Sequence, residues 1–151
     1  MITIKKGDIF KSEMDVLVNP VNCVGVMGKG LALEFKKRYP QMFQFYQKCC
    51  ADKIIYPGNP CFWRGDADII LFPTKLHWRE KSDMFCITQG LDTLINNYKE
   101  YWQWGFRSIA FPALGCGLGG LEWSEVAGIM VSKLVTLSID VEIYEPNEVT
   151  R

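Results

Sequence analysis

Three short segments hold residue types that suit ligand binding and chemistry. Residues 21–30 and 112–120 are rich in glycine, and residues 72–79 contain a lysine and the single histidine. A glycine turn that enters a helix presents free backbone N–H groups, which favour an anionic ligand. Glycine also lets the backbone come close to a ligand, because it lacks a Cβ. The first segment alone is equally consistent with a tight strand-to-helix connection, but a second glycine loop favours binding.

The elements around the first glycine segment follow from its neighbours. Residues 16–18 are apolar and predict a buried strand, and residues 28–39 predict an amphipathic helix that Pro40 ends. Leu31, Ala32 and Phe35 are expected to face the core. Residues 41–51 predict a second helix.

The rest of the chain alternates strands and helices. Strands are predicted at residues 2–4, 61–63, 69–72, 109–111 and 141–144. Helical spacing of apolar residues predicts two further helices, one through Ile87 and Leu91 and one through Val126 and Met130. This alternation predicts an α/β fold with a sheet between helices, and ligands bind outside the strand ends of such sheets. Two glycine loops at such strand ends would fit a ligand that has a diphosphate flanked by sugars.

Composition limits the possible functions. The chain has 151 residues, enough for one domain, with 17 Lys+Arg and 17 Asp+Glu. Because the charges balance, any contact with nucleic acid must be local. No apolar run approaches the roughly 20 residues that span a bilayer, and the N-terminus lacks a signal-peptide layout, so a cytoplasmic location is expected. With one histidine and no Cys-x-x-Cys pair, no metal is expected.

The three segments together resemble the motifs of macrodomains, the Appr-1″-p processing family. They are Asn22-Cys-Val-Gly-Val-Met-Gly-Lys-Gly-Leu-Ala-Leu-Glu-Phe35, Phe72-Pro-Thr-Lys-Leu-His-Trp-Arg79 and Pro112-Ala-Leu-Gly-Cys-Gly-Leu-Gly-Gly-Leu-Glu-Trp123. The chain looks most like the DarG antitoxin-type macrodomain, which removes ADP-ribose from thymidine in DNA. It is more distantly similar to the terminal ADP-ribose protein glycohydrolase.

The resemblance covers nearly the whole chain and implies one macrodomain over residues 1–151. The implied fold has three layers, α/β/α, with a mixed central sheet and an ADP-ribose cleft along the strand ends. The implied activity is hydrolysis of an ADP-ribosyl N-glycosyl bond without a cofactor. Two alternatives stay open: a module that binds ADP-ribose without cleaving it, and a phosphatase or deacylase acting on the distal ribose.

The resemblance also implies a substrate-binding set. Its members are Asp8, Ile9, Asn22, Met27, Gly28, Lys29, Gly30, Leu31, Thr74, Gly115, Cys116, Gly117, Leu118 and Gly119. Asp8 and Ile9 would contact adenine, Asn22 and residues 27–31 the distal ribose, and residues 115–119 the diphosphate. From its local sequence, Asp8 is also a common type of turn cap.

Lys75 is the residue to which the resemblance assigns catalysis, beside the anomeric carbon of the distal ribose. An amine there could polarise the leaving group or attack an opened sugar, if its pKa is lowered. On sequence alone Lys75 is more typical of an exposed loop lysine, and the motif match reverses that preference. Gly119 replaces an acidic residue of the terminal glycohydrolase, which favours a nucleic-acid substrate.

The expected partners are ADP-ribose and ADP-ribosylated DNA, single-stranded rather than duplex, with no membrane. A cognate ADP-ribosyltransferase toxin is a further possible partner. His77 and Trp78 could stack on a base, and Arg79 or Lys81 could hold a phosphate. Packing against the protein is the commoner role for such isolated aromatic residues.

Overall fold

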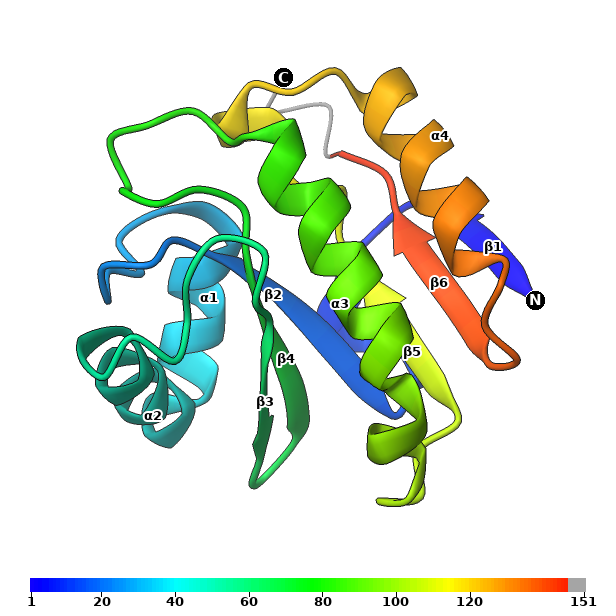
Figure 1. Cartoon of the computed structure of the whole chain (residues 1–151), viewed down its shortest axis with the longest axis horizontal. Helices are drawn as coiled ribbons and strands as arrows, with labels where there is room; N and C mark the ends of the chain where they lie inside the picture. The colour runs from blue at the N-terminus through cyan, green and yellow to red at the C-terminus, as the bar shows by residue number, and fades with distance from the viewer. Residues whose placement is uncertain (147–151) are drawn as a thin grey trace.

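One mixed sheet forms the centre of the protein. The computed structural model describes residues 1–146, and these contain a six-stranded sheet in the order β1-β6-β5-β2-β4-β3 (Figure 1). Its strands are β1 (Ile2–Lys5), β2 (Val16–Val21), β3 (Cys61–Arg64), β4 (Asp68–Pro73), β5 (Ser108–Phe111) and β6 (Asp140–Tyr144). Neighbouring strands from β1 to β4 are parallel, and β3 runs antiparallel to β4. The expected mixed sheet is confirmed.

Helices cover both faces of this sheet (Figure 1). They are α1 (Gly30–Arg38), α2 (Pro40–Ala51), α3 (Met84–Trp102) and α4 (Trp123–Leu134), with short 3₁₀ helices η1 (Ile9–Lys11) and η2 (Gly117–Gly119). The pair α3 and α4 packs on one face, and α1 and α2 pack on the other. The three-layer α/β/α arrangement is therefore confirmed.

The interior strands β2 and β4 are mainly apolar because both of their faces are covered. In β2, Val16 and Val18 pack in the core beneath α3 and α4, whereas Leu17 packs in the core beneath α1 and α2. In β4, Ile70 and Leu71 divide between the same two cores. A parallel strand buried on both faces has no polar side to present, so its sequence reads as a continuous apolar run.

Helix boundaries differ from the sequence prediction by one or two residues. The first helix begins at Gly30 rather than near residue 28, because Lys29 still has an extended backbone, with φ −148°. It ends at Arg38, and Pro40 starts α2 instead of merely stopping α1. Proline suits that first helical position, since its missing N–H would have no partner there. In residues 1–146, no helix is long and apolar enough to cross a membrane.

Candidate functional site

Three loops leave the same edge of the sheet. Strand β2 is parallel to both β4 and β5, and its last residue, Val21, lies opposite Pro73, the last residue of β4. The carboxyl ends of these strands therefore lie together, where ligands bind in open α/β folds. The loops that follow begin at Asn22, Thr74 and Pro112. The three segments singled out in the sequence are thus neighbours, and the β4–α3 loop is the long green one at the upper left of Figure 1.

The Asn22 side chain holds the first glycine loop in shape. Its Nδ2 donates to the Val26 carbonyl oxygen at 2.7 Å, and its Oδ1 accepts from the Val24 N–H at 3.1 Å. The hydroxyl of buried Tyr46 lies 2.6 Å from Asn22 Oδ1 and 2.9 Å from the Asn22 carbonyl oxygen. Since its oxygen is fully used, Asn22 has one remaining Nδ2 hydrogen to offer a ligand.

Hydrogen bonds also fasten the backbone around Lys75 to that loop. The Cys23 N–H donates to the Leu76 carbonyl oxygen at 2.9 Å, and the Cys23 thiol lies 3.4 Å from the Lys75 carbonyl oxygen. One residue earlier, the Thr74 N–H donates to the Val21 carbonyl oxygen at 2.9 Å. The Lys75 side chain therefore starts from a backbone that is fixed relative to the first glycine loop.

The Lys75 ammonium is partly buried and lacks a compensating charge. Among residues 1–146 it forms no salt bridge. Burial lowers the pKa of Lys75 below the ordinary lysine value, since desolvation disfavours the charged form. A larger fraction of Lys75 is therefore an uncharged, nucleophilic amine than for a fully exposed lysine.

The second glycine loop offers unused backbone donors. Its own hydrogen bonds run from Leu121 N–H to the Gly115 oxygen at 3.0 Å and from Gly120 N–H to the Gly117 oxygen at 3.1 Å. In the described part of the chain, the N–H groups of Gly117 and Leu118 have no acceptor. Successive free N–H groups of this kind form an anion-binding concavity.

The two glycine loops touch each other. Gly30 has φ +57°, and a Cβ built on it would lie 3.1 Å from Leu118 Cδ1. At the start of α1, the backbone N–H groups of Leu31 and Ala32 have no acceptor within residues 1–146. Free donors of the first helix thus lie next to those of the second loop, which is the arrangement expected for a shared anionic ligand.

The sequence profile of the Macro domain matches residues 18–130, which include all three loops. The chain belongs to the macrodomain family. Among its relatives is the DNA ADP-ribosyl glycohydrolase of Mycobacterium tuberculosis, 43% identical over 153 residues, which cover 97% of this chain and 43% of the relative. The fusion of a DNA ADP-ribosyl transferase and a DNA ADP-ribosyl glycohydrolase from Thermosipho africanus is 38% identical over 97% of this chain and 42% of its own length. The chain spans less than half the length of these relatives.

Solved structures show the same macrodomain fold. The macrodomain of Mycobacterium tuberculosis DarG superposes with a TM-score of 0.91 at 42% identity, covering 97% of this chain and 99% of that one. The complex of Thermosipho africanus DarTG with ADP-ribose gives a TM-score of 0.92 at 40% identity, covering 97% and 42%. The resemblance to DarG macrodomains read from the three motifs is confirmed.

The residues expected at adenine follow strand β1. Asp8 caps η1, its Oδ1 accepting from the Phe10 N–H at 2.9 Å, so the turn-capping role is present. Ile9 is buried against the core beneath α1 and α2. Only β6 separates β1 from β5, which the second glycine loop follows, and Phe10, next to Ile9, packs on Phe35 of α1 with ring centres 4.7 Å apart. Adenine contact by Asp8 and Ile9 stays a prediction.

Two other members of the predicted set, Met27 and Cys116, offer the ligand little through their side chains. The Met27 side chain is 1% exposed and packs in the core, so this residue can reach a ribose only with its main chain. Cys116 is partly buried, and burial raises the pKa of its thiol to about 11, which keeps it protonated and unreactive. Gly28 and Lys29 lie on the exposed part of the loop.

Two residues that support the site were not recognised from the sequence. Tyr46 lies in the helix predicted at residues 41–51, and its hydroxyl orients Asn22. Ser82 joins the loops: its N–H donates to the Gly119 oxygen at 2.9 Å, and its hydroxyl lies 3.4 Å from Thr74 Oγ1. Both contacts bridge residues that are distant in the chain, so local patterns could not indicate them.

Proposed function

We propose that this macrodomain is an ADP-ribosyl glycohydrolase that removes ADP-ribose from thymidine in DNA. The observation that carries the proposal is Lys75, a partly buried amine without a salt bridge in residues 1–146, fixed beside two glycine loops with free N–H donors. The names of relatives that are 38% and 43% identical over 97% of the chain support the substrate.

The site offers groups for the diphosphate and for the distal ribose of ADP-ribose. The N–H groups of Gly117 and Leu118, together with those at the start of α1, would bind the diphosphate. Residues 27–31, and the spare amide hydrogen of Asn22, would contact the distal ribose. The family's ligand supports this assignment, since the DarTG structure of Thermosipho africanus contains ADP-ribose.

Lys75 would then act on the anomeric carbon of that ribose. In the proposed route its neutral amine adds to C1″ while the bond from C1″ to the base nitrogen breaks. The base leaves with the bonding electrons and takes up a proton. The attacking nitrogen loses a proton, and its lone pair then breaks the bond from C1″ to the ring oxygen O4″, which takes up a proton and leaves a protonated imine of the opened sugar. Water hydrolyses this imine, which releases ADP-ribose and restores the amine. The net reaction consumes one water, and the lowered pKa of Lys75 supplies the amine that starts it.

A carboxylate is not available from the second loop. Gly119 occupies the position at which the terminal ADP-ribose glycohydrolase has an acidic residue. A Cβ on Gly119 would overlap the Ser82 hydroxyl, so the loop leaves no room for a side chain there. Lys75 is therefore expected to work without that acidic partner, which agrees with a substrate different from that of the terminal glycohydrolase.

The test is release of ADP-ribose from a single-stranded oligonucleotide that contains one ADP-ribosylated thymidine. Wild-type protein should restore the unmodified strand, and Lys75→Ala should lose at least about a hundredfold in rate, as expected for removal of a nucleophile. Equal rates for the two proteins would refute the role of Lys75. No release by wild-type protein, together with binding of free ADP-ribose in a calorimeter, would make the chain a binding module.

A second substrate class has some support. A relative named ADP-ribose 1″-phosphate phosphatase, from Ajellomyces capsulatus, is 34% identical, but only over 38% of this chain. Comparing turnover of ADP-ribose 1″-phosphate with that of the modified oligonucleotide separates the two activities. We expect the oligonucleotide to be preferred. The fusion relative from Thermosipho africanus supports a DNA ADP-ribosyltransferase as the enzyme whose product this protein would remove.

A further inference from the structure

The loop between β4 and α3 exposes a stack of planar side chains just beyond Lys75. Trp78 is 46% exposed. The guanidinium carbon of Arg79 lies 4.8 Å from the centre of the Trp78 ring, and the His77 ring centre lies 5.3 Å from it. None of these three side chains packs into either hydrophobic core. Trp78 therefore does not pack in the core, and it contacts the protein through His77 and Arg79.

This stack is held in place by the turn that bears it. The Arg79 N–H donates to His77 Nδ1 at 3.1 Å, and the Glu80 N–H donates to the His77 carbonyl oxygen at 3.0 Å. At the base of the turn, the Leu76 carbonyl oxygen accepts from the Cys23 N–H at 2.9 Å. The aromatic ring is thus presented in a defined position, which lowers the entropy lost when a ligand stacks on it.

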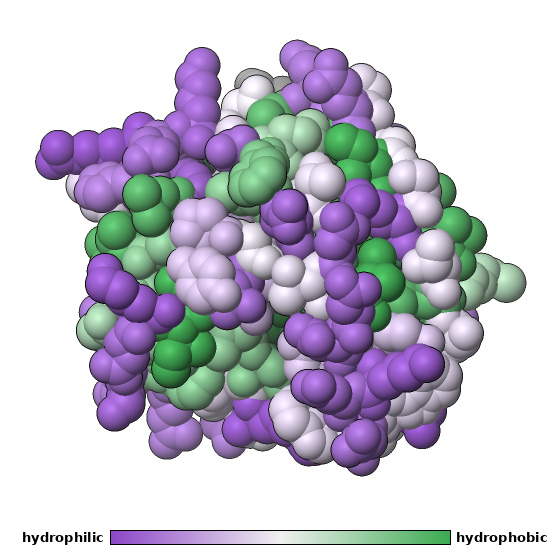
Figure 2. Space-filling model, viewed as in Figure 1, coloured by the Kyte–Doolittle hydropathy of each residue, from purple (hydrophilic) through white to green (hydrophobic). Residues whose placement is uncertain are grey.

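The same loop concentrates unpaired positive charge. Between residues 75 and 81 there are three cations, Lys75, Arg79 and Lys81, against one carboxylate, Glu80, in a chain whose net charge is 0. None of the three cations forms a salt bridge within residues 1–146. Figure 2 shows long hydrophilic side chains projecting from this upper-left corner, with hydrophobic side chains directly below them.

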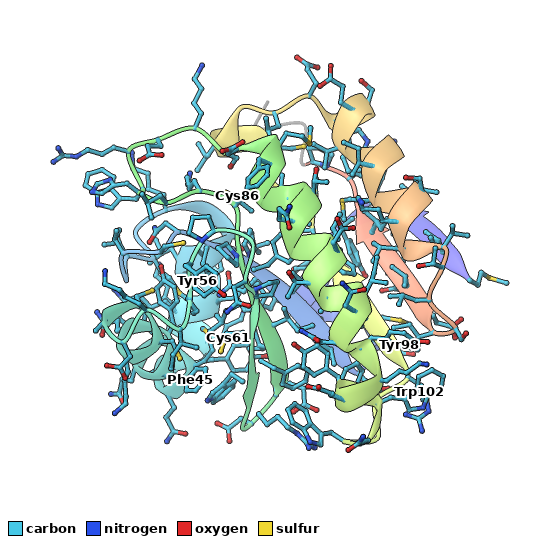
Figure 3. All side chains as sticks on the ribbon, in the orientation of Figure 1. Phe45, Tyr56, Cys61, Cys86, Tyr98 and Trp102 are labelled. Carbon is cyan, nitrogen blue, oxygen red and sulfur yellow. The ribbon has the colours of Figure 1, made fainter. Side chains whose placement is uncertain are left out.

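Apolar side chains also surround the three loops. Large hydrophobic residues that are exposed on these loops or at the start of α3 are Val24, Val26, Leu76, Trp78, Phe85 and Leu118. Apolar residues exposed together mark a binding surface more often than apolar residues exposed singly. In Figure 3, side chains project outward from the loop to the left of and above Cys86.

We infer that this loop binds the DNA strand on one side of the modified nucleotide. Trp78 stacks on the neighbouring base, and Arg79 and Lys81 contact the phosphates next to it. Because Trp78 is three residues from Lys75, their Cα atoms are at most about 11 Å apart, so the adjacent nucleotide is the one within reach. The inference rests on the proposed function and names the part of the substrate beyond ADP-ribose.

The chemistry of the loop favours a single strand. An unpaired base has a free π-face, and stacking of it on an aromatic side chain tolerates any base sequence. In a duplex that face is covered by the next base pair. Cations without carboxylate partners suit phosphates, whereas a protein partner would require a larger apolar surface. A protein partner is therefore the alternative outcome of the test.

The test measures equilibrium binding of a fluorescent oligonucleotide to proteins that carry Lys75→Ala, so that the modified base is not removed. Three probes are compared: single-stranded DNA with one ADP-ribosylated thymidine, its duplex, and ADP-ribosyl-thymidine alone. Adding Trp78→Ala should weaken binding of the single strand about tenfold, the loss expected for one base–aromatic stack. Binding of ADP-ribosyl-thymidine should not change, and Trp78→Phe should recover most of the loss.

Arg79→Gln provides an independent readout. It should weaken binding of the strand and reduce the slope of log K against log salt by about 1, as for one phosphate contact. The exposed cation Lys99 lies in the last turn of α3, at the opposite end of that helix from the loop, and provides the matched control, since Lys99→Gln should leave both quantities unchanged.

Two results would overturn the inference. One is equal binding of the single strand by the parent and Trp78→Ala proteins. The other is an equal loss for the strand and for ADP-ribosyl-thymidine, which would make Trp78 part of the ADP-ribose site or of the fold. The proposed function is judged separately, by hydrolysis with Lys75 present. A protein that binds the strand through Trp78 without cleaving it would retain this inference and lose that function.

Discussion

The Ser82 hydroxyl fills the space that a side chain at position 119 would need. The Ser82 N–H donates to the Gly119 oxygen at 2.9 Å, and a Cβ on Gly119 would also lie 3.0 Å from Ser82 Cβ. The loop before α3 and the second glycine loop are therefore packed so closely that glycine at 119 is a steric requirement. Gly119 is not among the glycines with positive φ, so space rather than backbone angle sets this requirement.

Replacing Gly119 by Ala should therefore destabilise the protein by about 1–3 kcal/mol, the usual cost of overpacking a close contact. ADP-ribose affinity should fall as well, because the diphosphate loop must move. Urea unfolding and calorimetry measure the two effects. Adding Ser82→Gly should recover part of both losses, with a coupling of at least about 0.5 kcal/mol. Additive losses would mean that the two residues do not compete for one space.

Tyr46→Phe should loosen the first glycine loop. The change leaves Asn22 Oδ1 without the hydroxyl that lies 2.6 Å away, in a buried position. Loss of one partner of a buried hydrogen bond costs about 1–3 kcal/mol. We expect a lower free energy of unfolding and weaker ADP-ribose binding. Tyr56→Phe is the control, since Tyr56 is 52% exposed and should change neither quantity. Unchanged binding by Tyr46→Phe would show that Asn22 orients itself without the hydroxyl.

Gly115→Ala should lower the stability of the protein, and Gly128→Ala should raise it. Gly115 has φ +73°, and a Cβ there would lie 2.6 Å from Leu121 Cδ1 and 2.8 Å from Ile87 Cδ1. Gly128 lies within α4, and a Cβ on it would meet nothing within 4 Å. We expect thermal stability to fall for the first change and to rise by about 0.5–1 kcal/mol for the second, the helix preference for alanine. ADP-ribose affinity should fall only for Gly115→Ala.

The pH dependence of the hydrolysis rate reports whether Lys75 acts as a neutral amine or as an ammonium. Burial lowers its pKa from the ordinary 10.5, because the fold disfavours the ammonium. The fraction of Lys75 that is a neutral amine therefore increases as pH rises. If the amine attacks C1″, single-turnover kcat/KM should rise with pH and level off below pH 10.5, the ordinary lysine pKa. A rate that falls over this range would assign Lys75 to polarising the leaving group as an ammonium. Borohydride should trap the imine only in the first case.

Lys75→Met tests whether a loss of activity on replacement of Lys75 comes from the missing amine rather than from a destabilised fold. At neutral pH burial of the charged lysine destabilises the fold; this cost falls as pH rises past the lowered pKa and is gone only above the ordinary lysine pKa of 10.5. Removal of the charge should therefore leave the free energy of unfolding unchanged within about 0.5 kcal/mol, or raise it. Activity should be lost as in Lys75→Ala. A large loss of stability would mean that Lys75 supports the fold.

Much of the fold could be predicted from the sequence because its signals are local. Residues 16–18 and 69–72 are apolar runs that both lie in interior strands, and the helical stripe through Ile87 and Leu91 lies on the face of α3 that packs in the core. The order of the strands could not be predicted, since β1 pairs with β6 across more than 130 residues of chain. That pairing depends on which edges remain free after the central strands assemble.

The individual loops of the site could be predicted from the sequence, but the contacts between these loops could not. Each glycine loop is recognisable by itself, and the three motifs together indicated the family. The contact between Gly30 and Leu118 and the bond from Cys23 to Leu76 join segments far apart in sequence. No pattern along the chain encodes such contacts. A boundary such as the start of α1 also depends on the backbone of one residue, Lys29. A single domain over residues 1–151 stays a prediction, because its last five residues lie outside the described range.

The most direct test of the account is a crystal structure of the Lys75→Ala protein with ADP-ribosyl-thymidine bound. We expect the diphosphate to accept hydrogen bonds from the N–H groups of Gly117 and Leu118. We also expect C1″ of the distal ribose to lie next to the position that the Lys75 amine occupies in the wild-type protein. A ligand bound at these loops with C1″ remote from residue 75, or bound elsewhere on the protein, would contradict the proposed mechanism.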